Sequence, residues 1–540
     1  MVASSSRLAA AAGVEILKAG GNAIDAAVAT GFALAVVYPE AGNIGGGGYM
    51  VIRLANGKTA AIDYREMAPQ SAYAEMYVDS AGHLSTGGAQ GRSASGVPGV
   101  AAGLTAALAK YGSMPLARVM APAIRMADQG IVVDSALARS VASKEKIFKR
   151  YGDGAAFLPG GNPIAVGAVL KQPELAETLQ LIAEKGRDGF YRGRTADLIA
   201  AEMRRGCADN VPPRARASHN CGLIIASDLA TYHPVWRSPI RTTFRGYTFV
   251  GMPPSSSGGT TLGETLNILD GFKALPEFGS ADYIHLVASA FQRAFIDRNE
   301  LLGDPDFVKD AAPRLTSKSH AAKLQRTIGL SRATPTQSLP APAHEGTETT
   351  HYSVVDKFGN AVATTTTLNS LYGSGVMIAG AGFFMNNTMD DFTSQPGTAN
   401  QFGLIQGRAN AIAPGKRALS AMTPTIVLDP SNQLFMVLGA RGGPRIITSV
   451  AEVILNVIAS RMTLADAMNA PRIHHQALPD TILYDAGRLD SSVVAKLQSM
   501  GYALKAEAYV GGSVVAIRRV RGGWEGMDDP RARGGGAVGY

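Results

Sequence analysis

Two strand-like stretches of β-branched and aromatic residues lie close together in the second half of the chain, around a polar loop at 356–360. The loop reads Asp-Lys-Phe-Gly-Asn, a composition typical of a hairpin turn that contains a glycine. If the turn is centred on Phe358, Thr349 faces Thr367 across the two strands. Side chains that face each other in this way have Cβ atoms about 5 Å apart, so the two hydroxyl groups are expected to be within reach.

A threonine hydroxyl is a weak nucleophile unless a base lies beside it, and the free amine of a threonine at a chain start is one known base. Thr349 has no free amine while Glu348 precedes it, so this chemistry requires cleavage between Glu348 and Thr349. The alternative is an ordinary sheet edge, because threonine is a good strand former and residues 349–367 include six threonines.

Elsewhere the hydrophobic pattern predicts both helices and strands. An alanine-rich helix at 5–17 ends at Gly20-Gly21, and Asn22 is placed to cap a second helix. Further helices are expected up to about residue 202 and at 281–302 and 446–458, with strands at 49–54, 59–64 and 241–250. The pattern alone therefore predicts a mixed α and β protein.

The longest apolar run, 26–38, is too short to cross a bilayer and suits a buried helix that ends at Pro39. The four glycines at 45–48 do not fit a dinucleotide-binding turn, because they follow a helix and precede a strand; we expect a tight turn. Residues 331–348 contain scattered proline, serine and threonine without periodicity, which indicates a flexible linker or a plain interdomain loop.

Composition excludes several classes of protein. With 46% hydrophobic and 17% charged residues among 540, the chain can bury a large core. The net charge of +8 is spread out, and only 7% of residues are aromatic, so nothing indicates a nucleic-acid partner. We interpret the positive charge as a solvated surface, with weak attraction for small anionic substrates as the alternative.

The two cysteines, Cys207 and Cys221, lie in one segment, 206–222. They are expected either to form a disulfide, as in an oxidising compartment, or to remain free thiols, and the sequence favours neither. No CxxC, His-x-His or His-Glu-x-x-His spacing is present, so we predict no metal site and no cofactor.

Several motifs, in this order along nearly the whole chain, resemble those of the γ-glutamyltransferase family of N-terminal nucleophile hydrolases. They are A-G-G-N-A-I-D-A-A-V-A at 19–29, G-N-I-G-G-G-G-Y-M at 42–50, D-Y-R-E-M-A-P at 63–69, M-P-P-S-S-S-G-G at 252–259, T-T-H-Y-S-V-V-D at 349–356, G-N-A-V-A at 359–363, N-N-T-M-D-D-F at 386–392, M-T-P-T-I-V at 422–427 and G-G-P-R-I-I at 442–447. The segment 206–222 looks like an insertion relative to the family.

The resemblance implies an α+β fold, a four-layer αββα sandwich in which two stacked antiparallel sheets lie between helical layers. It also implies a precursor that cuts itself when the Thr349 hydroxyl attacks the carbonyl of Glu348. A large subunit, 1–348, and a small catalytic subunit, 349–540, would then stay together as a heterodimer, with 331–348 as the flexible end of the large subunit.

The resemblance also implies the roles of the site residues. Thr349 is the nucleophile and Thr367 orients it. The N–H groups of Gly442 and Gly443, before the helix at 446–458, stabilise the oxyanion. The residues that hold the substrate's α-amino and α-carboxylate groups are, respectively, Asn369 with Asp391 and Arg65 with Ser420.

Some of these assignments have simpler alternatives. A glycine pair is otherwise only a turn, and Arg65 beside Asp63 and Glu66 is otherwise a surface ion pair, although a guanidinium is well shaped to hold a carboxylate. Residues 393–414 resemble the loop that covers the site in some family members, with Phe402 as its aromatic residue.

Two positions depart from the family pattern. Thr388 replaces a glutamine or glutamate that reaches the α-amino group, and Ala421 replaces a second serine beside the α-carboxylate. A hydrogen bond to a charged group contributes about 1.5–3 kcal/mol, so we expect altered recognition of the glutamyl head group with the acyl chemistry kept.

The function implied is transfer of the γ-glutamyl group of glutathione and related compounds to water or to an amino acid or peptide. One alternative is an acylase of the same family that acts on glutaryl or aminoadipyl side chains, as cephalosporin acylases do, and another is a non-catalytic exported scaffold or binding protein. The resemblance implies a periplasmic or secreted protein. Met1 is followed by neither a basic start nor an apolar signal core, so the chain resembles a mature or shortened form.

Overall fold

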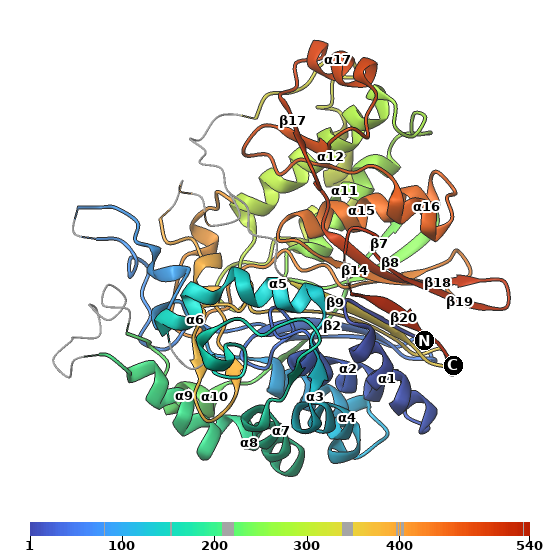
Figure 1. Ribbon diagram of the computed structural model, residues 1–540. Helices are drawn as coiled ribbons and strands as arrows, with labels where there is room; N and C mark the ends of the chain where they lie inside the picture. The colour runs from blue at the N-terminus through green and yellow to red at the C-terminus, as the bar shows by residue number, and fades with distance from the viewer. Residues whose placement is uncertain are drawn as a thin grey trace.

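A computed structural model describes residues 1–79, 81–151, 154–207, 221–336, 349–395, 398, 400, 404–532 and 534–540. Two β-sheets lie against each other at its centre, and helices cover the outer face of each sheet (Figure 1). The fold is therefore the αββα sandwich expected from the resemblance.

The first sheet has seven strands, all paired antiparallel. In spatial order they are β20 (Gly536–Val538), β1 (Val2–Ser4), β9 (Thr350–Val355), β10 (Ala361–Thr367), β2 (Gly47–Arg53), β3 (Thr59–Tyr64) and β6 (Val235–Arg237). The hairpin β9–β10 thus lies between strands from the first 53 residues of the chain.

The second sheet has six strands and is also antiparallel. In spatial order they are β19 (Gly523–Asp528), β18 (Ser513–Val520), β14 (Leu434–Arg441), β13 (Thr425–Leu428), β8 (Tyr247–Gly251) and β7 (Ile240–Phe244). Strands β9 and β10 pack against β14 of this sheet.

Both faces of the first sheet are buried, because successive side chains of a strand point to opposite faces. Val354 and Val362 join the core beneath the helices of the first layer, whereas Val355 and Ala363 join the core between the two sheets. Neighbouring residues of one strand, such as Val354 and Val355, therefore enter different cores.

The outer helices come from different parts of the chain. The first sheet is covered by α1 (Arg7–Lys18), α2 (Ala23–Val37) and α3 (Val100–Tyr111), and α4 (Leu116–Gln129) packs on α2. The second is covered by α11 (Gly258–Asp270) and α15 (Arg445–Ile458), and α12 (Ala281–Leu301) packs on α11.

The remaining elements are short or peripheral. The helices are α5 (Ser135–Ser143), α6 (Glu145–Tyr151), α7 (Pro173–Lys185), α8 (Asp188–Tyr191), α9 (Arg194–Arg204), α10 (Ala226–Thr231), α13 (Ala312–Leu315), α14 (Lys318–Gln325), α16 (Leu464–Asn469) and α17 (Ser491–Ser499). The strands are β4 (Ile131–Val132), β5 (Val169–Leu170), β11 (Met377–Ile378), β12 (Phe383–Phe384), β15 (Ile473–His474), β16 (Ile482–Asp485) and β17 (Leu504–Glu507).

The predicted hairpin register is confirmed. Val355 pairs with Ala361 and Thr350 pairs with Thr366. Continued by one residue, this register places Thr349 opposite Thr367. Asp356 fixes the turn, since its Oδ1 accepts the N–H groups of Phe358 and Asn360 at 2.8 and 2.9 Å.

The predicted helix boundaries also agree closely with the structure. Asn22 caps α2, because its side-chain oxygen accepts the N–H of Ile24 at 2.8 Å. Every residue of α2 is buried, as expected of the apolar run at 26–38.

Two local predictions were wrong. The single strand expected at 241–250 is two strands, β7 and β8, joined by a tight turn in which Arg245 and Gly246 both have positive φ. The tight turn expected across 45–48 is also not formed as such, since Gly47 and Gly48 are the first residues of β2. These glycines instead allow close packing: a Cβ on Gly48 would lie 2.5 Å from the carbonyl oxygen of Thr365.

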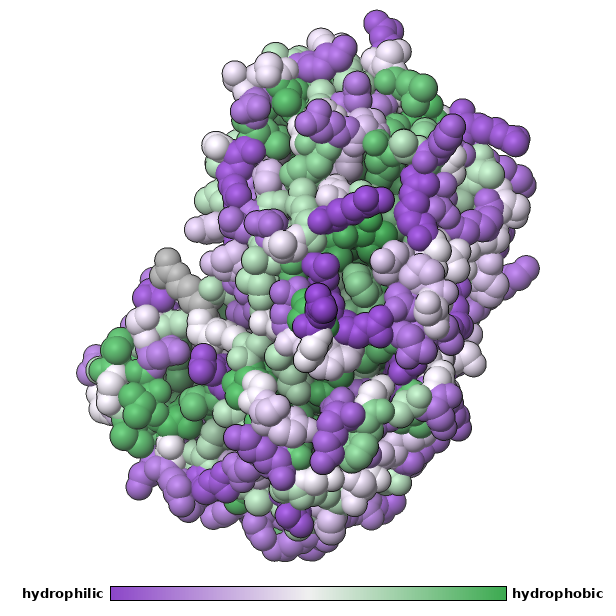
Figure 2. Space-filling view, turned by 90° about the vertical axis from the view of Figure 1, so that its right-hand side faces the viewer, coloured by the Kyte–Doolittle hydropathy of each residue, from purple (hydrophilic) through white to green (hydrophobic). Residues whose placement is uncertain are grey.

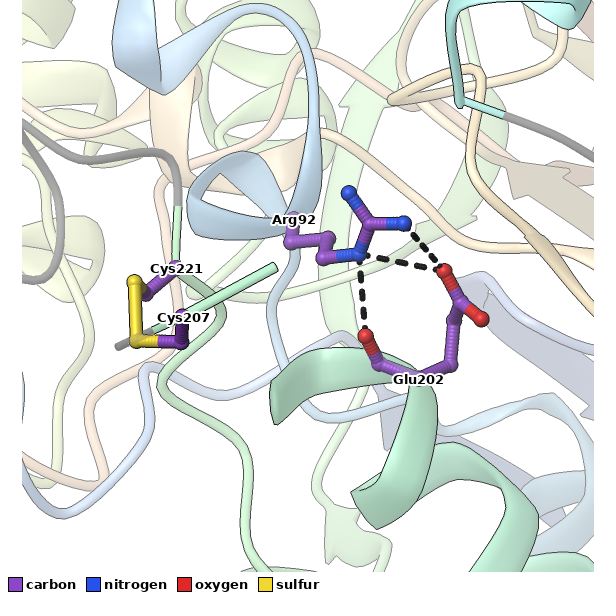
Figure 3. The surroundings of a disulfide bond; sticks show 4 residues. All are labelled: Arg92, Glu202, Cys207 and Cys221. Carbon is purple, nitrogen blue, oxygen red and sulfur yellow. Dashed lines mark hydrogen bonds and ion pairs between the residues drawn. A yellow bond between two sulfur atoms is a disulfide. The ribbon is translucent and has the colours of Figure 1, made fainter. Parts of the chain in front are cut away.

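Cys207 and Cys221 form a disulfide, which resolves the two alternatives left open by the sequence (Figure 3). Nearby, the Nε of Arg92 donates to the carbonyl and carboxylate oxygens of Glu202 at 2.9 and 3.0 Å (Figure 3). The residues between the two cysteines lie outside the described part of the chain.

Of the predicted linker, the described part is 331–336. The N–H of Ala333 donates to the carbonyl of Met500 at 2.8 Å, and that of Thr336 donates to Asp480 at 2.6 Å. Glu348 and the rest of the linker lie outside the described residues, as does Phe402.

Among the helices that the structure describes, none combines the length and hydrophobicity needed to cross a bilayer. On the face drawn in Figure 2, hydrophilic side chains are interspersed with hydrophobic ones.

The close packing at Gly46 predicts a cost for adding one carbon atom. A Cβ there would lie 2.0 Å from the carbonyl oxygen of Thr367. We expect Gly46→Ala to lower the free energy of unfolding by about 1–3 kcal/mol, measured by urea denaturation. Gly523→Ala is the control, since a Cβ at Gly523 meets nothing within 4 Å. Equal stability of the two variants would contradict the packing described.

Candidate active site

Most of the predicted site residues surround one narrow cavity of ≈ 30 Å³ at the ends of the central strands. Its lining residues are Arg65, Arg298, Thr349, Thr367, Asn369, Asp391, Asn400, Leu404, Leu419, Ser420, Ala421, Met422, Gly443, Pro444 and Ile446. Among the predicted site residues that the structure describes, Gly442 and Thr388 do not line it.

The two threonine hydroxyls predicted to face each other are in contact. Thr349 Oγ1 lies 3.3 Å from Thr367 Oγ1, and both side chains are buried. Thr367 Oγ1 also accepts the N–H of Asn369 at 2.8 Å, which fixes its position at the end of β10. A polar group therefore stands beside the candidate nucleophile.

Gly442 and Gly443 connect β14 to α15, and both have positive φ, at 128° and 56°. A Cβ on Gly442 would lie 2.8 Å from the Cα of Gly512, so the backbone at Gly512 passes very close to Gly442. Within the described residues, neither N–H donates to another backbone group. Gly443 lines the cavity with Thr349, whereas Gly442 is not one of the lining residues.

Arg65 is buried in the site and is not part of a surface ion pair. Its Nη1 donates to Glu66 at 3.0 Å, its Nη2 donates to Asp391, and its exposed fraction is 1%. Its backbone is held as well, because its N–H donates to Asp63 Oδ1 at 3.0 Å. One guanidinium thus joins two carboxylates inside the protein.

Burial shapes the protonation of this cluster. Burial raises the pKa of Asp391 to about 7, although the positive charge of Arg65 acts in the opposite direction. Burial also raises the pKa of Glu66. The pKa of Arg65 is raised by its two carboxylate partners despite burial, so it remains charged.

The turn after β10 carries Asn369, a non-glycine residue with a φ of 81°. Its side-chain amide donates to the carbonyl of Asn387 at 3.1 Å. That contact ties the turn to the short helical segment Thr388–Asp391, which carries Asp391. Thr388 in the same segment is buried beside Glu66. Its side chain acts against the burial that raises the pKa of Glu66.

Ser420 is positioned by the serine cluster at the start of α11. Its carbonyl accepts both the N–H and the Oγ of Ser257 at 2.7 Å, and its own N–H donates to Ser255 at 3.0 Å. Ser420 Oγ accepts the N–H of Met422 at 3.2 Å. Ala421 follows on the cavity wall and offers no hydroxyl there.

Two charged residues of the site escaped sequence reasoning. Arg298 lines the cavity, with its Nε donating to Ser257 Oγ at 2.9 Å, and burial lowers its pKa to about 10. In the sequence, Arg298 comes three residues after Phe295, on the apolar face of α12. A charged residue on that face was the only sign that it is buried. Glu66 lies inside a recognised motif but was considered only as a partner of Arg65 in the alternative surface ion pair.

Two stacked antiparallel sheets between helical layers, with a buried threonine hydroxyl at the start of a central strand, define an N-terminal nucleophile hydrolase. The sequence profile of the family described as Gamma-glutamyltranspeptidase matches residues 9–539. The chain belongs to this family.

Individual relatives include both main activities considered above. The chain is 43% identical over 540 residues to the glutathione hydrolase proenzyme of Escherichia coli (strain K12), covering 98% of this chain and 90% of that protein. It is 40% identical over 482 residues to the acylase ACY 1 proenzyme of Pseudomonas sp. (strain SE83), covering 88% and 82%. The solved structure of a cephalosporin acylase from Bacillus halodurans has a TM-score of 0.83 at 28% identity, covering 100% of this chain and 95% of that one.

The buried charge cluster predicts a pH-dependent cost of removing its cation. Arg65→Met leaves Asp391 and Glu66 without their shared partner, so we expect a loss of about 3–5 kcal/mol in the free energy of unfolding at pH 7. Carboxyl groups of the unfolded chain titrate near pH 4, and below that both states are protonated. The difference from the parent protein should therefore shrink as pH falls from about 7 to about 4.

Urea titrations at several pH values measure this difference. Arg125→Met is the control, because Arg125 pairs with Glu15 at an exposed site, at 2.7 Å. It should change stability little at any pH. A loss of stability in Arg65→Met that does not vary with pH would contradict the buried charge cluster of Arg65, Glu66 and Asp391.

Proposed function

We propose that the protein is a γ-glutamyltransferase and glutathione hydrolase that matures by cutting its own chain before Thr349. The observation that carries the proposal is the contact between the Thr349 and Thr367 hydroxyls, inside a cavity that also holds Arg65 and Asp391. Such a site offers a nucleophile at one end and paired charges at the other.

In the maturation step, Thr349 Oγ1 attacks the carbonyl carbon of Glu348. The peptide C–N bond breaks as the C–O bond forms, and the proton of the hydroxyl passes to the departing nitrogen. Water then opens the ester, which leaves a carboxylate on Glu348 and restores the hydroxyl. The free amine of Thr349 is the product that the later chemistry needs.

The topology supports a stable two-chain product. Strands β9 and β10 of the small subunit pair with β1 and β2 of the large subunit on either side. Each of the two subunits, 1–348 and 349–540, thus supplies neighbouring strands of the first sheet. The heterodimer is held by the backbone hydrogen bonds and the core of that sheet.

In turnover, the Thr349 hydroxyl attacks the γ-amide carbonyl of the substrate while the Thr349 amine takes its proton. That proton passes to the leaving amine, and a γ-glutamyl ester remains on Thr349. Thr367 orients the hydroxyl, and the N–H groups of Gly442 and Gly443 stabilise the oxyanion. Water or the amine of an amino acid or peptide then takes the acyl group.

The charges at the other end of the cavity suit an amino-acid head group. Arg65 and Asp391 pair with each other in this structure. A bound head group with one carboxylate and one ammonium can replace that contact on both sides, with Arg65 and Ser420 on the carboxylate. Asp391 and Asn369 then hold the ammonium. The cavity must widen to admit it, since ≈ 30 Å³ is less than a glutamyl group fills.

The main alternative is an acylase for glutaryl side chains, as the name of the Pseudomonas relative suggests. The departures at Thr388 and Ala421 favour it, because both change the head-group end. The intact Asp391 favours the γ-glutamyl substrate, because a buried carboxylate there has little purpose without a substrate amine. A non-catalytic exported protein is the alternative from another class.

We further propose export to the periplasm or the medium. The Cys207–Cys221 disulfide supports this location, because disulfides persist mainly in oxidising compartments.

A comparison of two chromogenic substrates tests the proposed specificity. We expect kcat/KM for γ-glutamyl-p-nitroanilide to exceed that for glutaryl-p-nitroanilide at least tenfold. Asp391→Asn should reduce the first value by about 10-fold to 100-fold, equivalent to a charge-assisted hydrogen bond of ~1.5–3 kcal/mol, and should barely change the second. Preference for the glutaryl compound would overturn the assignment in favour of the acylase.

A denaturing gel tests self-cleavage independently of substrate. The parent protein should run as bands of roughly two-thirds and one-third of 56.2 kDa. Thr349→Ala should remain a single band, because it lacks the attacking hydroxyl, and Thr350→Ala at the neighbouring position should still be cut. Cleavage of Thr349→Ala at the usual rate would exclude Thr349 as the nucleophile.

A further inference from the structure

Away from the cavity, three helices of the outer layer bring together two carboxylates and an imidazole. Glu264 is on α11, Asp297 on α12 and His320 on α14. His320 Nε2 lies 2.6 Å from Asp297 Oδ2 and 3.3 Å from Glu264 Oε1. Their ligand-type atoms all lie within 4.8 Å of one another.

Glu264 is the unusual member of this group. Its side chain is fully buried at 0% exposure, yet neither carboxylate oxygen accepts a hydrogen bond from the described residues. The imidazole nitrogen nearest to it makes its hydrogen bond to Asp297 instead. A buried carboxylate whose nearest cationic group, the His320 imidazole, is already hydrogen-bonded to Asp297 is costly, and a bound cation would offset that cost.

The neighbouring cations do not fill that role. Lys318 on α14 is tied to Asp270 and to the carbonyl of Thr243, both at 2.8 Å. Arg314 acts on Glu264 only through its charge, without a hydrogen bond in the described part of the chain. Two carboxylates therefore share a single imidazole.

We propose that Glu264, Asp297 and His320 bind a divalent transition-metal ion, with Zn²⁺ as the reference ion. Two carboxylate oxygens and one imidazole nitrogen are ligands that zinc accepts, with water in the remaining position. Ligands at ~2.1 Å from zinc lie about 3.0–3.4 Å apart for bond angles between 90° and 109°. The 3.3 Å separation of Glu264 and His320 already fits, and the partly exposed Asp297 needs to move back by only about 0.5 Å to meet that spacing.

The ion would join three helices that are otherwise held mainly by apolar packing. Asp297 immediately precedes Arg298, which lines the active-site cavity, and α11 begins directly after Ser257, which holds Ser420 in place. The proposed site is thus structural, on helices that carry or adjoin residues of the cavity.

Zinc binding to the untagged, full-length protein tests the proposal. Isothermal titration with Zn²⁺, with equilibrium dialysis and elemental analysis as a second readout, should give one tightly bound equivalent per chain. Glu264→Gln and His320→Gln keep the size and polarity of the side chains and should each weaken binding at least tenfold. Saturating Zn²⁺ should also raise the melting temperature of the parent protein but not of these variants.

His83→Gln is the matched control, since His83 lies beside Asp79 in an exposed contact at 3.5 Å. It should bind zinc as the parent protein does. The proposal is overturned if the parent binds no zinc below about 100 μM, a loose surface affinity, or if Glu264→Gln and His320→Gln bind it as tightly as the parent.

Discussion

The register of the β9–β10 hairpin is the constraint on which the rest of the site depends. Strands have a side-chain period of two, so a shift by one residue would move Thr349 from the cavity to the opposite face. The register is fixed by the Asp356 turn at one end and by pairing with β1 and β2 on both sides. The hydroxyl contact between Thr349 and Thr367 follows directly from it.

Because the hairpin lies between strands of the proposed large subunit, the two chains can stay together after cleavage. A chain cut in the middle of a domain would fall apart unless each piece continued to supply neighbours to the other. The proposed cut before Thr349 lies just before a central strand whose partners on both sides come from the first 53 residues. Cleavage can therefore free an amine inside the protein without releasing the strand that carries it.

Much of this arrangement could be predicted from the sequence, and the exceptions have physical reasons. The hairpin and the buried helix α2, which Asn22 caps, depend on local patterns, and the sequence predicted them correctly. The β7–β8 turn was missed because Arg245 adopts a positive φ that arginine rarely shows. Arg298, the pairing of Arg65 with Asp391 and the Glu264 cluster depend on helices and loops far apart in sequence, where no local spacing reveals the contact.

The central claim is that Thr349 becomes a chain start, so that its own amine can act as the base. The most direct measurement is the N-terminal residue of the smaller chain of the purified protein, by Edman sequencing or intact-mass spectrometry. We predict Thr349. A smaller chain that begins at another residue, or an uncut protein with full activity on γ-glutamyl amides, would contradict the account.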